Sequence, residues 1–245
     1  MFCSNDYLGL ACHPRIAEAL AEGAQIWAGG SGASHLISGH TLAHEQLENR
    51  LACWFSPHIP RARVLSFSTG YMANLAVTTA LGDSEAEFFS DELNHASLID
   101  GIRLANKQNS AAIHVYPHQD LTHLENLLKK DSNPFKLIVT DAVFSMDGNI
   151  AKINQLLELA ETYDTLLMID DAHGFGVLGK QGHGALEHFG ITANDPRSSR
   201  IIYIGTLGKA AGLSGAFIAA HASLTEWVMQ KGRAYIYTTA SPPSI

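Results

Sequence analysis

The stretch Leu166-Leu167-Met168-Ile169-Asp170-Asp171-Ala172-His173-Gly174 decides the fold class. Its first four residues are all apolar, and acidic residues, a histidine and a glycine follow them directly. An unbroken apolar run of strand length predicts a strand buried on both faces, which is typical of parallel sheets covered by helices. Ligands of such sheets bind beyond the carboxyl ends of the strands. The polar residues after this run therefore predict a functional site.

The same pattern extends in both directions along the chain. Amphipathic stretches separate short apolar runs, which indicates βαβ units and an α/β fold with a mainly parallel sheet flanked by helices. The expected strands are 64–67, 87–90, 113–116, 137–141, 166–170 and 201–204. The expected helices are 71–81, 96–105, 121–128 and 153–163, with two earlier ones that begin near Pro14 and after a Thr41 cap. We expect residues 1–40 to form an N-terminal helix and glycine-rich loop leading into one large domain, 41–245.

Composition excludes several classes of partner. The chain has 245 residues and a formal net charge of −8, which argues against binding to nucleic acid or to an anionic membrane. No run of apolar residues is long enough to span a bilayer, and no secretory signal segment is evident. Three cysteines, Cys3, Cys12 and Cys53, form no C-x-x-C pair, so we expect buried or idle thiols in a reducing compartment. The expected location is the cytoplasm.

Lys209 is the first candidate for covalent chemistry. It follows the strand 201–204 and Gly208, and small residues come after it, so that a planar ligand can approach the backbone. Asp170 ends another apolar strand, where a buried carboxylate needs a partner such as a pyridinium N–H. His173 lies three residues further on. The alternatives at this stage are a surface lysine, an internal ion pair and a satisfied core histidine.

A glycine turn, Ser68-Thr69-Gly70-Tyr71-Met72-Ala73-Asn74, joins a strand to a helix. The free N–H groups and the positive dipole end of that helix suit a phosphate, although an ordinary βα turn has the same composition. Residues 174–179 match G-x-G-x-x-G, but Lys180 and Gln181 follow instead of an apolar helix, so we interpret the match as accidental. His40 and His44 have the spacing of a metal pair without a third ligand, and no metal is expected.

Several motifs in the same order resemble those of the α-oxoamine synthases. These enzymes have the transferase fold of type I and use pyridoxal 5'-phosphate (PLP) to condense an amino acid with an acyl-CoA. The resemblance covers nearly the whole chain and rests on Asn5-Asp6-Tyr7-Leu8-Gly9-Leu10, Asn94-His95-Ala96-Ser97, Phe144-Ser145-Met146-Asp147-Gly148 and Tyr237-Thr238-Thr239-Ala240-Ser241-Pro242-Pro243. It implies that residues 41–245 are the PLP-binding large domain.

The resemblance implies catalytic roles for three residues. Lys209 would hold PLP as a Schiff base and then move the α-proton of the substrate. Asp170 would pair with the pyridine nitrogen and keep it protonated. His95 would stack on the cofactor ring and contact the substrate.

The resemblance also assigns the remaining cofactor contacts. Ser145 and His173 would contact the ring hydroxyl. Gly70, Tyr71 and Thr206 would hold the phosphate.

Within the family, the motifs are most similar to those of the biotin-pathway branch. Glycine-dependent relatives carry serine in place of Ala172 and a cysteine in the turn at 68–74, and neither occurs here. The implied reaction condenses L-alanine with pimeloyl-CoA, or with a pimeloyl carrier-protein thioester, to form 8-amino-7-oxononanoate. A homodimer is expected. The alternatives are a glycine C-acetyltransferase or another oxoamine synthase, a dinucleotide-dependent oxidoreductase, and a remnant without catalysis.

Family members also carry an N-terminal segment and a small C-terminal domain for which these residues have no match. The C-terminal domain of the family supplies an arginine for the substrate carboxylate. We therefore expect these residues alone to bind PLP but to turn over poorly or not at all, because the carboxylate of the acyl chain needs a cation and closure of the site needs the small domain.

Overall fold

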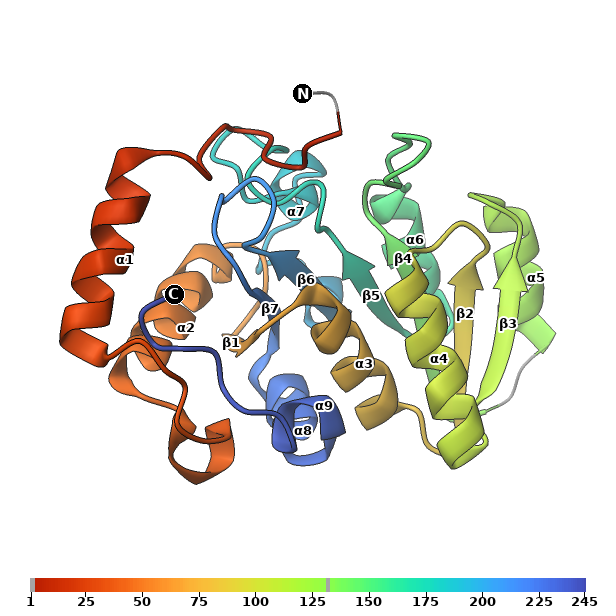
Figure 1. Cartoon of the computed structure of the whole chain (residues 1–245). Helices are drawn as coiled ribbons and strands as arrows, with labels where there is room; N and C mark the ends of the chain where they lie inside the picture. The colour runs from red at the N-terminus through yellow and green to blue at the C-terminus, as the bar shows by residue number, and fades with distance from the viewer. Residues whose placement is uncertain (1–2, 131–132) are drawn as a thin grey trace.

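One sheet with the strand order β1-β7-β6-β5-β4-β2-β3 organises the computed structural model, which describes residues 3–130 and 133–245 (Figure 1). The strands from β6 to β3 are parallel, whereas β7 is antiparallel to both β1 and β6. Their bounds are β1 Ala62–Phe67, β2 Ala86–Asp91, β3 Ala112–Tyr116, β4 Phe135–Asp141, β5 Leu166–Asp170, β6 Ile201–Thr206 and β7 Ala216–His221. The mainly parallel α/β sheet predicted from the sequence is confirmed.

The strand β7 was not predicted. It contains three alanines among its six residues, and alanine is depleted in strands. Its place between β1 and β6 buries all but His221, so tertiary packing decides its conformation. The antiparallel pairing of β7 also brings the chain back along β6, which closes the loop 207–215 that carries Lys209.

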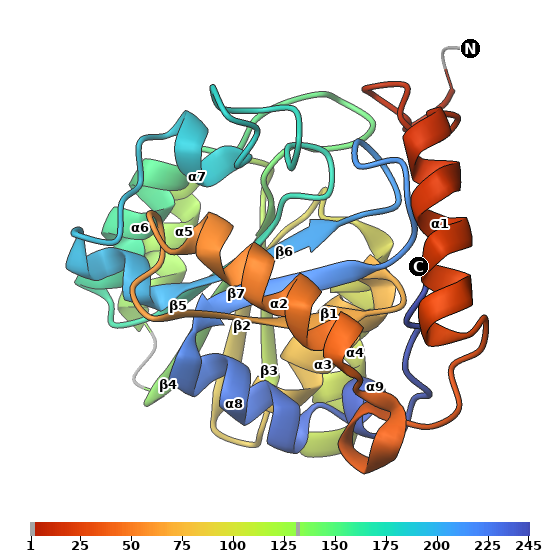
Figure 2. The ribbon, with the colours of Figure 1, turned by 90° about the vertical axis from the view of Figure 1, so that its left-hand side faces the viewer.

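Two layers of helices cover the sheet (Figures 1 and 2). Buried side chains of one layer share a core with one face of the sheet, and they come from α3 (Gly70–Leu81), α4 (Ala96–Asn109), α8 (Ala222–Lys231) and α9 (Arg233–Ile236). The opposite core is formed with α2 (Leu42–Phe55), α5 (Leu121–Lys130), α6 (Ile153–Thr162) and α7 (Ala185–His188). Alternate residues of each strand serve the two cores, which accounts for the unbroken apolar runs in the sequence.

The expected helices all form, with shifted ends. Thr41 caps α2 through a reciprocal pair of contacts with His44, and Pro14 begins α1 (Pro14–Trp27). No residue of α1 is buried, and the helix lies at the side of the molecule in both views. Short helices also occur at His35–Gly39 and Pro196–Arg200.

The segment 1–40 contacts the rest of the chain at several places; its residues Met1 and Phe2 lie outside the described residues. Ser34 forms a β-bridge with Thr239, and the N–H of Ala240 donates to the carbonyl of Ala33 at 3.0 Å. Tyr7, near the other end, reaches His173 at the edge of the sheet. In the part of the chain that the structure describes, no helix combines the length and apolarity that crossing a membrane requires.

Candidate active site

A polar cavity of about 170 Å³ lies at the carboxyl ends of the parallel strands. Residues that follow β2, β4, β5 and β6 meet the first turn of α3 there, because parallel strands end at a common edge. The structure brings all eight residues predicted for the site to this cavity. Its lining consists of Gly70, Tyr71, His95, Ser97, Asp141, Ser145, Asp170, Ala172, His173, Thr206 and Lys209.

Lys209 projects from the loop between β6 and β7. The loop is closed by backbone hydrogen bonds from Leu207 to Gly215 at 2.9 Å and from Gly212 to Lys209 at 3.0 Å. Burial lowers the pKa of Lys209, and the nearby carboxylate of Asp170 offsets this effect only in part. A lowered pKa increases the fraction of neutral amine, which is the form that can attack a carbonyl or accept a proton.

His173 links Lys209 to the N-terminal segment. Its Nε2 lies 2.8 Å from Lys209 Nζ, and its Nδ1 lies 2.5 Å from the hydroxyl of Tyr7. Burial, followed by the charge of Lys209, lowers the pKa of His173 to about 4, so the ring is neutral at neutral pH. A neutral imidazole donates from one nitrogen and accepts at the other. Tyr7, His173 and Lys209 therefore form a chain along which hydrogen-bond direction can reverse when Lys209 gains or loses a proton.

Asp170 is buried at the end of β5, with 5 % of its surface exposed. Its carboxylate accepts hydrogen bonds from Asn74 Nδ2 at 2.6 Å and from the N–H of Ala172 at 3.0 Å. An ionised carboxylate has about four acceptor sites, so it retains capacity for a further donor in the cavity.

A second carboxylate, Asp141, lies beside Asp170 in the register of β4 and β5. Burial and then the charge of Asp170 raise the pKa of Asp141 to about 8. Asp141 therefore carries a proton at neutral pH, and its Oδ2 accepts the N–H of His95 at 2.7 Å. The proximity of Asp170 favours the protonated form of Asp141, because like charges in a buried site oppose each other.

The N-terminus of α3 faces the other end of the cavity. Thr69 caps this helix by accepting the N–H of Met72 at 3.2 Å, and the N–H groups of Gly70 and Tyr71 have no acceptor within the helix. A Cβ at Gly70 would meet no atom within 4 Å, so there is open space beside these donors. Thr206 lines the same cavity, and its hydroxyl donates to the carbonyl of Gly215 at 3.1 Å. The arrangement suits a phosphate group.

The remaining predicted residues come from loops. His95 caps α4 and accepts the N–H of Ser97 at 3.2 Å, while Ser145 lies in an exposed turn after β4. Both residues line the cavity.

The rival motifs serve structural purposes. Residues 174–179 form turns without a following long helix, and the N–H of Gly176 donates to the carbonyl of Gly182 at 2.9 Å. His40 pairs with Glu48 at 3.0 Å, and the described residues contain no cluster of three ligands suited to a metal. The three cysteines are free and exposed, so of the two alternatives, buried or idle thiols, burial is wrong.

Sequence reasoning assigned no role to three residues of the site. Asp141 ends an apolar strand as Asp170 does, and that signal was sufficient to identify it. Asn74 is a fully buried polar residue in the apolar helix α3, which is a weaker signal. Tyr7 has no local signal, because its contact with His173 spans 166 residues of sequence.

The donor set fits PLP. A buried carboxylate can face a ring nitrogen, a lysine of lowered pKa can bond to the aldehyde carbon, and a helix N-terminus can hold the phosphate.

Comparison of sequences gives one family and a group of similar enzymes. The profile of the family "Aminotransferase class I and II" matches residues 1–245. The 8-amino-7-oxononanoate synthase of Leptothrix cholodnii is 62 % identical over 244 residues, and that of Cupriavidus taiwanensis is 60 % identical. Each alignment covers 100 % of this chain and 58 % of the relative. The chain therefore spans less than two thirds of the length of these relatives.

Solved structures share the fold over almost the whole chain. The serine palmitoyltransferase of Sphingomonas wittichii is 26 % identical with a TM-score of 0.88, covering 99 % of this chain and 58 % of that one. The 8-amino-7-oxononanoate synthase of Francisella tularensis is 34 % identical with a TM-score of 0.81, covering 100 % and 65 %. A structure of SPT with a PLP internal aldimine is 29 % identical with a TM-score of 0.87, covering 99 % and 58 %.

Proposed function

The chain belongs to the aminotransferase class I and II family, and we propose that it contains the PLP-binding machinery of an 8-amino-7-oxononanoate synthase. The convergence of all eight predicted residues on one small polar cavity carries this proposal. The relatives with that name are about 60 % identical along the whole chain, which supports the biotin-pathway member over other oxoamine synthases. The region 41–245 is the proposed cofactor domain, with 1–40 as its N-terminal approach.

The residues of the cavity have complementary roles toward the cofactor. Lys209 would bond to it, and Asp170 would accept the N–H of its ring. Gly70, Tyr71 and Thr206 would hold the phosphate at the first turn of α3. His95 would cover the ring face, and Ser145 with His173 would contact the ring hydroxyl.

PLP supplies an electron sink that stabilises negative charge at the α-carbon of a bound amino acid. The chain's own contribution is to hold and move protons at defined atoms. Lys209 Nζ has a lowered pKa, and in its free, unprotonated form it would take the α-proton of the bound amino acid. Its neighbour His173 Nε2 accepts or donates a hydrogen bond at 2.8 Å as Lys209 changes its charge.

The proposed substrates are L-alanine and a pimeloyl thioester on coenzyme A or a carrier protein. The proposed enzyme is a cytoplasmic homodimer. Condensation followed by loss of carbon dioxide would give 8-amino-7-oxononanoate, an acyltransferase reaction. His95 would contact the substrate from the exposed side of the cavity.

Reductive trapping tests the cofactor assignment. We expect the purified protein to bind PLP and to absorb near the boundary of the visible and ultraviolet ranges. Borohydride should then fix the pyridoxyl group on the peptide that contains Lys209, and Lys209→Ala should abolish the label. A label on another lysine would refute the proposed site.

Amino-acid preference tests the branch of the family. Spectral titration with L-alanine, glycine and L-serine should give the tightest response with L-alanine. A preference for glycine would assign the chain to the glycine-dependent branch, while leaving the cofactor site in place.

A further inference from the structure

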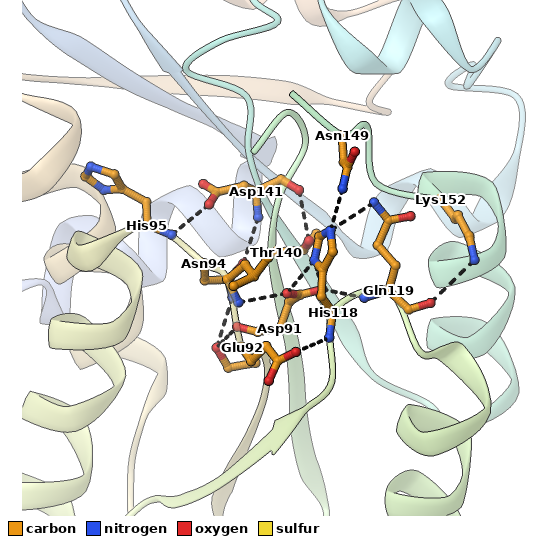
Figure 3. Close-up of polar contacts among 12 residues, drawn as sticks. Asp91, Glu92, Asn94, His95, His118, Gln119, Thr140, Asp141, Asn149 and Lys152 are labelled. Atoms are coloured by element: carbon orange, nitrogen blue, oxygen red, sulfur yellow. Dashed lines mark hydrogen bonds and ion pairs between the residues drawn. The ribbon is translucent and has the colours of Figure 1, made fainter. Parts of the chain in front are cut away.

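A hydrogen-bond network lies beside the cavity, where β2, β3 and β4 end (Figure 3). Its central members are Asp91, the last residue of β2, and His118, which follows the edge strand β3. Neither residue lines the cavity. The network nevertheless connects two loops that line the cavity, one carrying His95 and the other carrying Ser145.

Asp91 is buried, with 2 % of its surface exposed, and its carboxylate is saturated with donors. Oδ1 accepts the N–H of Leu93 at 3.0 Å, and Oδ2 accepts the N–H of Gln119 at 2.9 Å. His118 Nδ1 lies 3.0 Å from Oδ1 and 3.2 Å from Oδ2. A single side chain therefore holds the turn after β2 and the turn after β3.

This arrangement determines the tautomer of His118. Both oxygens of Asp91 accept backbone N–H groups, so His118 Nδ1 is the donor toward this carboxyl group. Nε2 then accepts the hydrogen bond that Asn149 Nδ2 donates at 3.0 Å. The imidazole therefore passes the orientation set by Asp91 on to Asn149.

Asn149 belongs to the same turn as Ser145. The turn is closed by hydrogen bonds from the N–H of Phe144 to the carbonyl of Asn149 at 3.0 Å and from Gly148 to Phe144 at 2.8 Å. The ring of Phe144 also packs edge-on against His118, with centroids 4.4 Å apart. His118 thus supports, through two contacts, a turn that is otherwise exposed to solvent.

The other arm of the network runs to His95. Asn94 Nδ2 donates to Ser90 Oγ at 2.9 Å, and Asn94 Oδ1 accepts the N–H of Asp141 at 3.0 Å. Asp141 in turn accepts the N–H of His95. Because Asp91 shapes the turn immediately before Asn94, its loss loosens the segment that places His95.

We propose that Asp91 and His118 are positioning residues that hold the His95 loop and the Ser145 turn in register around the cavity. The inference rests on the proposed function, because it assumes that His95 and Ser145 contact the cofactor in the cavity. The geometry does not depend on the cofactor, because the buried carboxylate of Asp91 and the partly buried imidazole of His118 contact both loops directly or through one further residue.

Two substitutions of His118 separate the two arms. The amide of asparagine lies where Nδ1 lies, so His118→Asn keeps a donor to Asp91 but loses contact with Asn149. The amide of glutamine reaches the place of Nε2, so His118→Gln keeps an acceptor for Asn149 but loses the donor to Asp91. Hydrogen exchange of the cofactor-free protein reports each loop separately.

We expect His118→Asn to accelerate exchange of the Phe144 and Gly148 amides by about 5- to 10-fold, with the His95 amide unchanged. His118→Gln should accelerate the His95 and Leu93 amides instead. Equal effects on both loops in both variants, or no effect on either, would overturn the proposal.

A matched control lies on the same two strands. Glu87 and His114 also form a carboxylate–imidazole pair between β2 and β3, at 2.8 Å, but nearer the opposite edge of the sheet. His114→Gln should leave exchange in both loops and PLP affinity unchanged. An effect of this variant equal to that of His118→Gln would show only a general role in stability.

Cofactor affinity provides the second readout. Asn149→Ala removes an exposed side chain that the fold does not need, and we expect the dissociation constant for PLP to rise about 3-fold. Asp91→Asn places an amide, itself a donor, among three donor groups. We expect this change to raise the dissociation constant for PLP by about 10-fold or more. Unchanged PLP affinity in both variants would refute positioning. If the wild-type protein bound no PLP, the proposed function would fail, and hydrogen exchange would still decide the positioning role.

Discussion

Two neighbouring cavities differ in size and in chemistry. The larger one, about 650 Å³, is lined mainly by apolar residues that include Leu47, Leu51 and Trp54 of α2. The smaller one, about 170 Å³, contains Lys209, His173 and two aspartates. They share the loops after β5 and β6, so a few residues of chain separate them. The size of a cavity therefore does not locate the chemistry in this protein.

The difference arises from how each cavity is built. Helix α2 presents side chains selected for packing, and Arg50 is the one charged residue among the described residues that line the larger cavity. The smaller cavity lies where parallel strands end, which concentrates titratable groups in a partly buried volume. Burial there lowers the pKa of Lys209 and raises that of Asp141 to about 8. Perturbed pKa values of this kind are typical of functional sites, which favours the small cavity as the proposed site.

Asp170→Asn should have the largest effect and tests whether the strand-end carboxylate gives the small cavity its chemistry. The amide cannot supply the charge that holds a proton on the ring nitrogen. Its NH₂ group also faces Asn74 and Ala172, which donate hydrogen bonds to the carboxylate of Asp170. A charge-assisted hydrogen bond corresponds to about a 10- to 100-fold effect. We expect the rate at which the α-proton of L-alanine exchanges with D₂O, measured by NMR, to fall by this factor. The affinity for PLP should fall by less.

Trp54→Leu in the larger cavity is the control for that comparison. It should lower the midpoint of thermal unfolding but leave PLP affinity and α-proton exchange within about twofold, because Trp54 contacts Phe175 and His183 rather than the polar cavity. A loss of α-proton exchange comparable to that of Asp170→Asn would show that the two cavities work as one site.

Tyr7→Phe should have an intermediate effect. It removes the hydroxyl that lies 2.5 Å from His173 Nδ1. His173, which contacts Lys209 through Nε2, then has no hydrogen bond to Tyr7. We expect α-proton exchange to fall about 3- to 10-fold with little change in stability. Tyr237→Phe serves as the control, since Tyr237 is 72 % exposed. Identical rates for Tyr7→Phe and the wild type would remove Tyr7 from the site.

The smallest expected effect concerns pH and the stability of the cofactor-free protein. The folded state holds the pKa of His173 at about 4, below its ordinary value of 6.5. The unfolded chain therefore binds a proton first as pH falls, and the contribution of His173 to the free energy of unfolding is lost between pH 6.5 and 4. His173→Gln should show a shallower decrease across this window in denaturant titrations. Burial also lowers the pKa of His35 to about 4. Since His35 is present in the wild type and in the variant, its contribution cancels when the two pH profiles are compared. Parallel pH profiles would contradict the neutral state assigned to His173.

Much of the fold followed from local patterns. The strand 166–170 was predicted because its residues are apolar on both faces, and its terminal aspartate marked the site. Pro14 and Thr41 marked helix starts for reasons that lie within one helical turn. By contrast, the alanine-rich strand β7 has weak intrinsic preference and forms because β1 and β6 bury it from both sides.

The sequence by itself determined the class of fold, the family resemblance and eight of the residues that line the cavity, because these depend on short motifs and on the rule that parallel strands end at one edge. Only the tertiary structure decided which groups accompany them. Tyr7 reaches His173 across 166 residues, Asn74 reaches Asp170 across 96, and Asp91 meets His118 across 27. Such contacts depend on the packing of helices and on the order of strands in the sheet. No local pattern encodes them, since each partner alone has an ordinary place in its own segment.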